Sequence, residues 1–240
     1  NGNLKLYEFG NCYFYDEASR DAEKPLAAYS EQYRLAIAVT GTAVPQSWNE
    51  KPQAASFFTL RAVAEKLLRR FGLDIYTLKS EPLQSDLFGD GLSLWLGGKE
   101  LLQMGVVASQ IRRAFDLKQE VYYLEMNFDA LVKSTRKHRI AFEELSKFPE
   151  VKRDLALLVD RQVTFAQLRA IALAAERKLL KSVSLFDVYE GDKLPEGKKS
   201  YALSFILEDK TRTLDDKTIE RVMSNLTRQF EQRCGAQIRA

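Results

Sequence analysis

The stretch SLFDVYEGDKLPEGKKSYALSFILED carries polar side chains where a fully buried strand would carry apolar ones. Two strand-like runs flank a loop rich in Gly, Pro and Lys, and Asp187 and Tyr189 alternate with Phe186 and Val188. Because successive side chains of a strand point to opposite faces, the first pair should share one face with Ser200 of the returning run. A ring beside a carboxylate and a hydroxyl can bind a single-stranded base, since the ring stacks and the carboxylate accepts from base N–H groups.

The same count extends this polar face to the neighbouring runs. Ala156 should point outward on the preceding run, and Ala202 and Ser204 on the returning one, whereas Phe186 and Val188 should face the covering helices. Cations that could contact phosphates surround the face in the sequence: Lys152, Arg153, Lys193, Lys198, Lys199 and Arg212. An ordinary hydrated face with one incidental tyrosine and a solvated lysine loop would have the same pattern.

The elements that must position these residues follow from hydrophobic periodicity. The pattern predicts a helix that opens at Thr213, with Asp216 as its capping-box partner, and ends at Gly235 before a short last strand. The other elements expected in this region are strands over 154–160, 182–190 and 200–208 and a helix over 164–180. This β-α-β-β-α-β order is the ferredoxin-like arrangement, in which both helices cover one sheet face and leave the other open.

The preceding region predicts a second α+β unit, mainly antiparallel. Its expected elements are strands over 3–15, 33–43 and 120–128, a helix over 56–72 and a hairpin over 91–108. A polar, charged segment that closes at Pro149 separates the regions, and we place the domains at 1–145 and 146–240.

Composition excludes several classes of function. Cys12 and Cys234 fit no metal or disulfide pattern and are expected to be reduced thiols of a cytoplasmic protein, and His138 is the only histidine. Zinc chemistry, a histidine-activated nucleophile and a phosphate-binding glycine loop are therefore not predicted. No apolar run approaches the roughly 20 residues of a membrane span. The start at Asn1 has no initiator Met and no signal sequence, so we expect a segment of a longer protein.

The net charge of +3 is unevenly distributed. Residues 1–146 carry a net charge of −1 and residues 147–240 a net charge of +4. The second region is therefore the one that electrostatics favours for an anionic partner.

Four motifs of the second region, FPEVKRDLA, LFDVYEG, PEGKKS and RCGAQIR, closely resemble the ferredoxin-like anticodon-binding domain of the bacterial phenylalanyl-tRNA synthetase beta subunit. The resemblance runs from about Ser146 to Ala240. The first region is similar, more loosely, to the second half of the catalytic-like module of the same subunit, through LKLYEFGNCYF, SFFTLRAVAEKLL and MGVVASQIRRAFDL.

This resemblance implies an (αβ)2 heterotetramer that joins phenylalanine to its tRNA with ATP and Mg²⁺ in the cytoplasm. The alpha subunit carries the chemistry, so the segment alone should be non-catalytic and hold no cofactor or metal. Neither a motif-two RxE strand nor a motif-three glycine run appears in the first region. The implied partners are the anticodon loop of tRNA(Phe) and the alpha subunit.

The implied anticodon contacts coincide with the polar face. Tyr189 matches the tyrosine that stacks on the first anticodon base, a guanine, and Asp187 matches the aspartate that reads it. Ala156 matches a small residue against which the base packs, and Ser200 a serine that reaches another base. We add four neighbouring cations as candidate phosphate contacts: Lys152, Arg153, Lys198 and Lys199.

Two other classes of function stay open from the residues alone. Ferredoxin-like domains also act as small-molecule sensors, although the glycine-rich loop that such sensors use does not follow the first strand here. The segment could also be a structural module that only assembles a larger complex.

Overall fold

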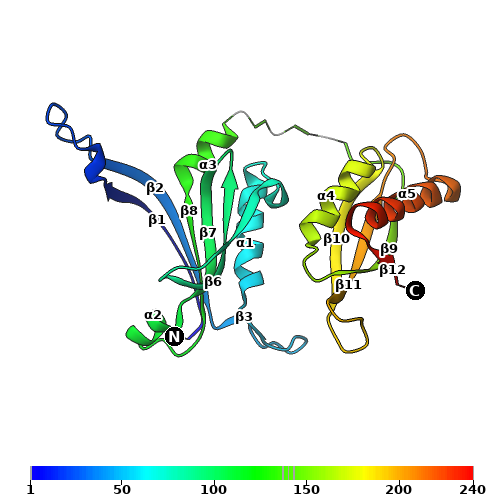
Figure 1. The fold of residues 1–240 in the computed structure, drawn as a ribbon, viewed down its shortest axis with the longest axis horizontal. Coiled ribbons are helices and arrows are strands. Elements are labelled where there is room, and N and C mark those ends of the chain that lie inside the picture. Colours follow the sequence, from blue (N-terminus) through cyan, green and yellow to red (C-terminus); the bar gives the residue numbers. More distant parts are fainter. Residues whose placement is uncertain (1, 137, 140, 143, 240) are drawn as a thin grey trace. The chain divides into compact units, whose positions relative to one another are not determined.

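The structure is a computed structural model that describes residues 2–136, 138–139, 141–142 and 144–239. The chain forms two compact units, Asn1–Ala141 and Phe142–Ala240 (Figure 1). The domain boundary expected between 145 and 146 lies in the same connecting segment, which joins α3 (Phe128–Thr135) to β9 (Val151–Asp160). Each unit is mixed α and β with antiparallel sheets, so the predicted fold class is confirmed.

Unit 1 is built on an antiparallel sheet with the strand order β1-β2-β8-β7-β6-β5. Its other elements are short helices and a small ribbon, β3-β4. The element bounds are β1 (Leu4–Tyr15), β2 (Tyr29–Thr40), β3 (Thr42–Val44), β4 (Gln53–Ala54), α1 (Phe57–Arg70), β5 (Lys79–Leu83), β6 (Phe88–Leu96), β7 (Lys99–Val107), α2 (Ser109–Ala114), β8 (Val121–Asn127) and α3.

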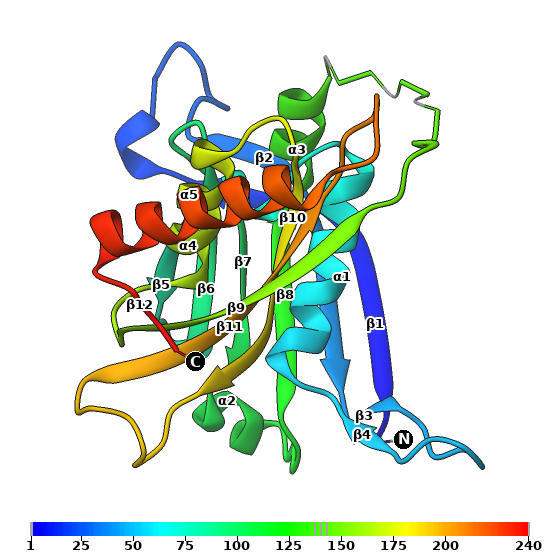
Figure 2. The ribbon, with the colours of Figure 1, turned by 90° about the vertical axis from the view of Figure 1, so that its right-hand side faces the viewer.

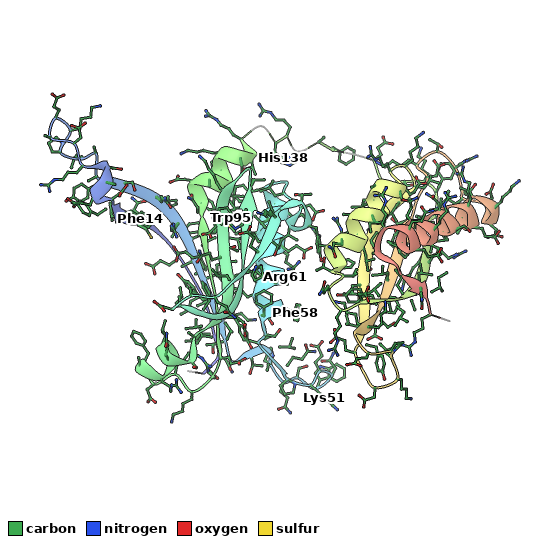
Figure 3. The ribbon with its side chains drawn as sticks, in the orientation of Figure 1. Phe14, Lys51, Phe58, Arg61, Trp95 and His138 are labelled. Carbon is green, nitrogen blue, oxygen red and sulfur yellow. The ribbon has the colours of Figure 1, made fainter. Side chains whose placement is uncertain are left out.

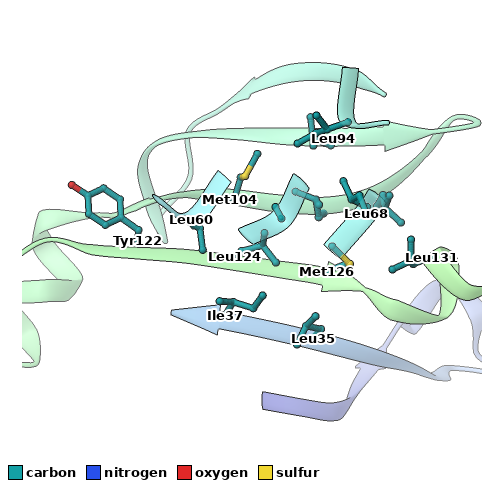
Figure 4. Packing of buried hydrophobic residues seen from close by; sticks show 14 of the residues in the cluster. Leu35, Ile37, Leu60, Leu68, Leu94, Met104, Tyr122, Leu124, Met126 and Leu131 are labelled. Carbon is teal, nitrogen blue, oxygen red and sulfur yellow. The ribbon is translucent and has the colours of Figure 1, made fainter. Parts of the chain in front are cut away.

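Helix α1 covers the middle of this sheet. Ser56 caps it, because the Ser56 hydroxyl accepts from the Thr59 N–H and the Thr59 side chain accepts from the Ser56 N–H. Leu60, Ala64 and Leu68 recur at four-residue steps and are fully buried, as an amphipathic helix requires. They pack against side chains of β2, β7 and β8, including Leu35, Ile37, Met104, Leu124 and Met126 (Figure 4).

The β1–β2 ribbon extends beyond the part of the sheet that α1 covers (Figure 1). Residues 7, 9, 13 and 15 of β1 alternate onto the face whose β2 partners include Ile37 and Leu35, which is the core face. Tyr7 is nevertheless 75% exposed and Tyr13 74% exposed. Phe9 packs edge-to-face on Phe128 of α3, whereas Tyr7 and Tyr13 are left largely uncovered by the described part of unit 1.

Unit 2 has the predicted β-α-β-β-α-β order. Its elements are β9, α4 (Phe165–Ala175), β10 (Leu180–Tyr189), β11 (Lys198–Leu207), α5 (Asp216–Cys234) and β12 (Gln237–Ile238). The antiparallel strands lie in the order β10-β11-β9-β12. Both helices lie on one side of the strands (Figure 2), and one core cluster joins Leu168 of α4 and Phe230 of α5 to Leu157, Leu203 and Phe205 of the sheet.

Both helices of unit 2 are shorter than the sequence predicts. Helix α4 ends at Ala175 rather than near residue 180, and the Glu176 carboxylate accepts the N–H groups of Lys178 and Leu179 beyond it. Helix α5 begins at Asp216, and its N-cap is Asp215, whose carboxylate accepts from the Thr218 N–H. The capping box expected at Thr213 is therefore wrong.

The C-terminal end of α5 matches the prediction. Gly235 adopts φ +60°, a left-handed conformation that glycine enters without steric cost. Its N–H donates to the Glu231 carbonyl, and the Ala236 N–H donates to the Phe230 carbonyl, which closes the helix and turns the chain toward β12.

Candidate nucleic-acid interface

The face of the unit 2 sheet opposite α4 and α5, called here the open face, brings the predicted base-binding residues together. Strand pairing places Asp187 opposite Ala202, which in turn lies opposite Ala156. In the next row, Tyr189 lies opposite Ser200. Opposed side chains on neighbouring antiparallel strands are about 4.5–5.5 Å apart, so the four predicted residues occupy two adjacent rows around the small Ala202.

A β-bulge in β10 determines which side chains reach this face. The pairing of β10 with β11 shifts between Leu185, opposite Leu203, and Asp187, opposite Ala202. Leu203 is a core residue, so unbroken alternation from Leu185 would have turned Asp187 toward the helices. The additional residue, Phe186, reverses the phase and brings Asp187 onto the open face.

The prediction that Phe186 faces the covering helices is wrong, whereas Val188 lies opposite the core residue Tyr201, on the helix side that the alternation predicts. Phe186 occupies the bulge and is 58% exposed, and the Lys152 ammonium lies 5.8 Å from its ring centroid. Val188 lies near the end of β10 and is 45% exposed. Phe186 therefore adds a second aromatic ring near the open face, which periodicity alone could not place.

Tyr189 is half-buried, and its ring has neighbours that the sequence did not predict. The Arg239 guanidinium lies 5.3 Å from the ring centroid, in cation–π distance. The Arg239 backbone is fixed beside β9, because its N–H donates to the Ala156 carbonyl at 2.9 Å. A Cβ added at Gly191 would lie 2.5 Å from the Tyr189 hydroxyl, so only glycine fits beside the ring in this arrangement.

Asp187 is exposed and makes no hydrogen bond or ion pair to any other described residue. The other carboxylates of the open face are paired: Asp154 with Lys152 at 3.7 Å and Asp160 with Lys198 at 2.7 Å. Asp187 is thus the carboxylate of this face that retains its full capacity to accept from a ligand's N–H groups.

The serines of β11 are more deeply buried than is usual for side chains on a solvent-exposed face of a sheet. Ser200 is 6% exposed and Ser204 4% exposed, because β11 is an inner strand with neighbours on both sides. The Ser204 hydroxyl has no hydrogen-bond partner among the described residues. An unsatisfied buried hydroxyl costs free energy, so Ser204 is a polar group that a ligand on this face could satisfy.

The four predicted phosphate contacts divide between the two faces of the sheet. Lys152 and Lys198 lie on the open face, where each pairs with an aspartate. Lys199 is 8% exposed, and its ammonium lies 4.6 Å from the ring centroid of Tyr201, a core residue. Arg153 is exposed, but its strand position is opposite Phe205 of the core face. The structure therefore does not bring Lys199 and Arg153 to the base-binding residues.

The described side chains of unit 1 form interactions that stabilise its sheet. Arg34 forms an ion pair with Glu125 across β2 and β8. The Glu120 carboxylate, which accepts from the Tyr122 hydroxyl, raises the pKa of Tyr122 to about 12. Phe14 on the β1–β2 ribbon lies apart from Phe58 and Arg61 of α1 (Figure 3).

Two features of the described residues bear on metal binding and on the reactivity of the Cys234 thiol. The described part of the chain contains no group of three or more His, Cys, Asp or Glu residues that could hold a metal ion. Burial raises the pKa of the Cys234 thiol, which donates to the Phe230 carbonyl, so this thiol is a poor nucleophile. None of the described helices is long and apolar enough to cross a membrane.

Comparison with known families gives two matches. Residues 146–239 match the ferredoxin-fold anticodon binding domain, and residues 1–128 match the phenylalanyl tRNA synthetase beta chain CLM domain. These two regions leave unmatched residues 129–145, which include most of α3 and the connecting segment, and residue 240.

The chain also matches curated proteins that are longer than it is. The phenylalanine–tRNA ligase beta subunit of Bacteroides thetaiotaomicron is 47% identical over 240 residues, and that of Porphyromonas gingivalis is 43% identical. These matches cover 100% and 99% of this chain but 29% of each relative. A solved pyrrolysyl-tRNA synthetase from Desulfitobacterium hafniense is similar to 58% of this chain and 47% of its own, with a TM-score of 0.38 and 16% identity.

Proposed function

Because the chain belongs to the phenylalanyl-tRNA synthetase beta chain family, we propose that its second unit binds the anticodon loop of tRNA(Phe) through the open face. The observation that carries this proposal is the convergence of Tyr189, Asp187, Ala156 and Ser200 in two adjacent rows of one sheet face. A stacking ring, an unpaired carboxylate and a floor of small side chains are the groups that single-stranded RNA recognition uses.

Each residue has a distinct role in this proposal. Tyr189 stacks on the first anticodon base, and the Asp187 carboxylate accepts from the N1 and N2 donors of a guanine at that position. The small side chains of Ala156 and Ala202 leave room for a base to lie on the open face above them. Ser200 contacts a second base. Arg239 orients the Tyr189 ring and adds a positive charge beside the RNA backbone.

Two cations of the open face supply phosphate contacts in the proposal. Lys152 and Lys198 lie there, and releasing them from Asp154 and Asp160 costs little because ion pairs this exposed are weak. Arg153 reaches RNA only where the backbone continues past the edge of the sheet. Lys199 contributes through its packing on Tyr201, since its ammonium is buried on the other face.

The chain spans less than a third of the length of the curated relatives that it matches. The enzymatic function is therefore proposed for the whole protein. We propose that this protein pairs with an alpha subunit in an (αβ)2 heterotetramer that uses ATP and Mg²⁺ to charge tRNA in the cytoplasm. In that assembly unit 1 serves as a non-catalytic contact region and unit 2 as the RNA-binding region.

Binding of an anticodon stem-loop RNA by the 240-residue chain tests the proposal. We expect saturable binding that weakens when the first anticodon base is changed from guanine to adenine. A stem-loop with an unrelated loop sequence is the control. Equal binding of all three RNAs, or binding of amino acids with no binding of RNA, would overturn the proposal in favour of a structural or sensor module.

A further inference from the structure

A groove on the helix side of unit 2 concentrates positive charge away from the open face. It lies between the segment that follows α4, the loop that joins β11 to α5, and one side of α5, and has a volume of about 770 Å³. Pockets for small ligands typically measure roughly 300–1,000 Å³. Leu179 and Val222 contribute apolar surface, and the rest of the lining is polar or charged.

The charges in this groove do not cancel. Four cations line it, Lys178, Arg212, Arg221 and Arg228, against two carboxylates, Glu176 and Asp209. Both carboxylates are already engaged. Glu176 accepts two backbone N–H groups, and Asp209 accepts from the Thr211 N–H and hydroxyl and from Arg212.

Three cations therefore have no counter-ion. Lys178, Arg221 and Arg228 form no ion pair with any other described residue. The hydrogen bonds from Thr211 and then the Arg212 guanidinium hold the pKa of Asp209 below its usual value. Asp209 is therefore ionised at neutral pH and balances the charge of Arg212, so Arg212 is not counted among the three cations without a counter-ion.

Two of these cations lie along one side of α5, and one of them, Arg228, is held by a hydrogen bond. Arg221 and Arg228 are seven residues apart on α5, about two helical turns, so both face the groove. Asn225 lies between them, and its amide donates to the Ala175 carbonyl at the end of α4. Its carbonyl oxygen accepts from the Arg228 guanidinium at 3.0 Å, which directs that side chain along the groove.

We propose that this groove binds a small ligand that carries adjacent phosphate groups, such as pyrophosphate or a nucleoside diphosphate. Guanidinium groups match phosphate oxygens with two parallel hydrogen bonds, and two arginines spaced along a helix suit a ligand with more than one phosphate. The partly exposed apolar side chain of Leu179 offers a contact for the organic part of such a ligand. This ligand binding is separate from the proposed binding of RNA.

The position of the groove favours a small ligand over the RNA bound by the open face. The lining residues of α5 belong to an element that packs on the core face of the sheet, opposite Tyr189 and Asp187. An anticodon loop seated on the open face would therefore leave the groove accessible.

Calorimetric titration of the 240-residue chain with pyrophosphate at fixed ionic strength tests the proposal. We expect one binding site, with sulfate binding more weakly because it offers a single oxyanion group. The double variant Arg221→Gln, Arg228→Gln should weaken pyrophosphate binding about tenfold or more, since each lost contact is a hydrogen bond to a charged group. Both side chains are exposed, so the melting temperature should be unchanged.

A double variant of equal charge provides the control. Lys217→Gln with Arg233→Gln removes two exposed cations from the same helix outside the groove and should bind pyrophosphate within about twofold of the parent chain. Equal weakening by both double variants would reduce the effect to general charge and overturn the site. The site is also overturned if pyrophosphate does not bind and the groove variant binds the stem-loop more weakly, because the groove would then contact RNA. Pyrophosphate binding by a chain that binds no RNA would uphold the groove and reject the anticodon proposal.

Discussion

Tyr189 is the residue whose replacement best separates RNA binding from folding. Its ring is half-buried beside Arg239 and Gly191 and lies outside the core cluster of unit 2. We expect Tyr189→Ala to weaken anticodon stem-loop binding by roughly ten- to a hundredfold, because base–aromatic stacking contributes about 1–3 kcal/mol. Tyr189→Phe keeps the ring and should bind nearly as the parent does. Unchanged RNA affinity in a folded Tyr189→Ala chain would exclude stacking on this ring.

Asp187 should affect which base is bound more than how tightly RNA is bound. Asp187→Ala removes an unpaired acceptor but no stacking surface, so the preference for guanine over adenine at the first anticodon position should fall. Competition between the two stem-loops measures this ratio. Asp154→Ala, which removes a carboxylate of the same face that is already paired with Lys152, is the matched control and should preserve the preference. Loss of the preference in both variants would point to general charge.

At these two residues the sequence predicted the correct face, although the count of alternation missed how they reach it. The phase of β10 changes at Phe186, and a bulge has no reliable signal in one sequence, since it depends on pairing with β11. Arg239 could not be assigned to the site either, because it reaches Tyr189 only through the pairing of β12 with β9. Hydrophobic periodicity predicts individual elements, but it does not predict contacts between segments that are distant in the sequence.

Strand β11 provides a matched pair of lysines on opposite faces. Lys198 lies on the open face, whereas Lys199 is buried over Tyr201. Lys198→Ala should weaken binding to all RNA sequences alike and reduce the slope of log affinity against log salt by about 0.7. Lys199→Ala should leave that slope unchanged and lower the melting temperature instead. The same reduction of the slope by both substitutions would show that Lys199 turns outward to reach RNA.

The start of α5 depends on Asp215, whose carboxylate accepts from Thr218. Leu214 precedes this cap and Ile219 follows within the first turns, and both belong to the core, as in a hydrophobic staple. Buried Leu214 thus fixes where the helix starts, which explains why the sequence signal at Thr213 was misleading. Local capping patterns offer several candidates, and packing selects one.

Asp215→Ala should lower the melting temperature in a pH-dependent way. The Thr218 hydrogen bonds hold the pKa of Asp215 below its ordinary value of 3.8, so the carboxylate stabilises the fold above that pH. This stabilisation is lost as the pH falls through the lower folded-state pKa. The difference in melting temperature between Asp215→Ala and the parent should therefore be full at pH 7 and shrink below pH 3.8. A difference that is constant over this range would show that the charge has no part in the cap.

In both units most helices and strands could be predicted from the sequence, because the apolar residues of each element recur with the spacing of a helix or of a strand. Helix α1 and the hairpin of β6 and β7 lie where hydrophobic spacing and the Gly97–Gly98 turn place them. The exposure of the β1–β2 ribbon was not visible in its pattern. Its alternating aromatic residues are typical of a strand with one buried face, and only the structure shows that no residue of β1 joins the core cluster beneath α1.

The last prediction concerns this ribbon. Tyr7 and Tyr13 share the core-side face of β1 and are 75% and 74% exposed, beside a strand edge that is paired on one side only. Exposed apolar surface next to an open strand edge promotes association, so the 240-residue chain should bind a hydrophobic dye and self-associate with increasing concentration. Tyr7→Ser with Tyr13→Ser should reduce both effects, as measured by dye fluorescence and sedimentation velocity. Trp48→Ser, which removes a 97% exposed aromatic side chain outside the ribbon, should change neither. A parent chain that stays monomeric at high concentration without binding dye would show that the aromatic face of β1 is covered in solution.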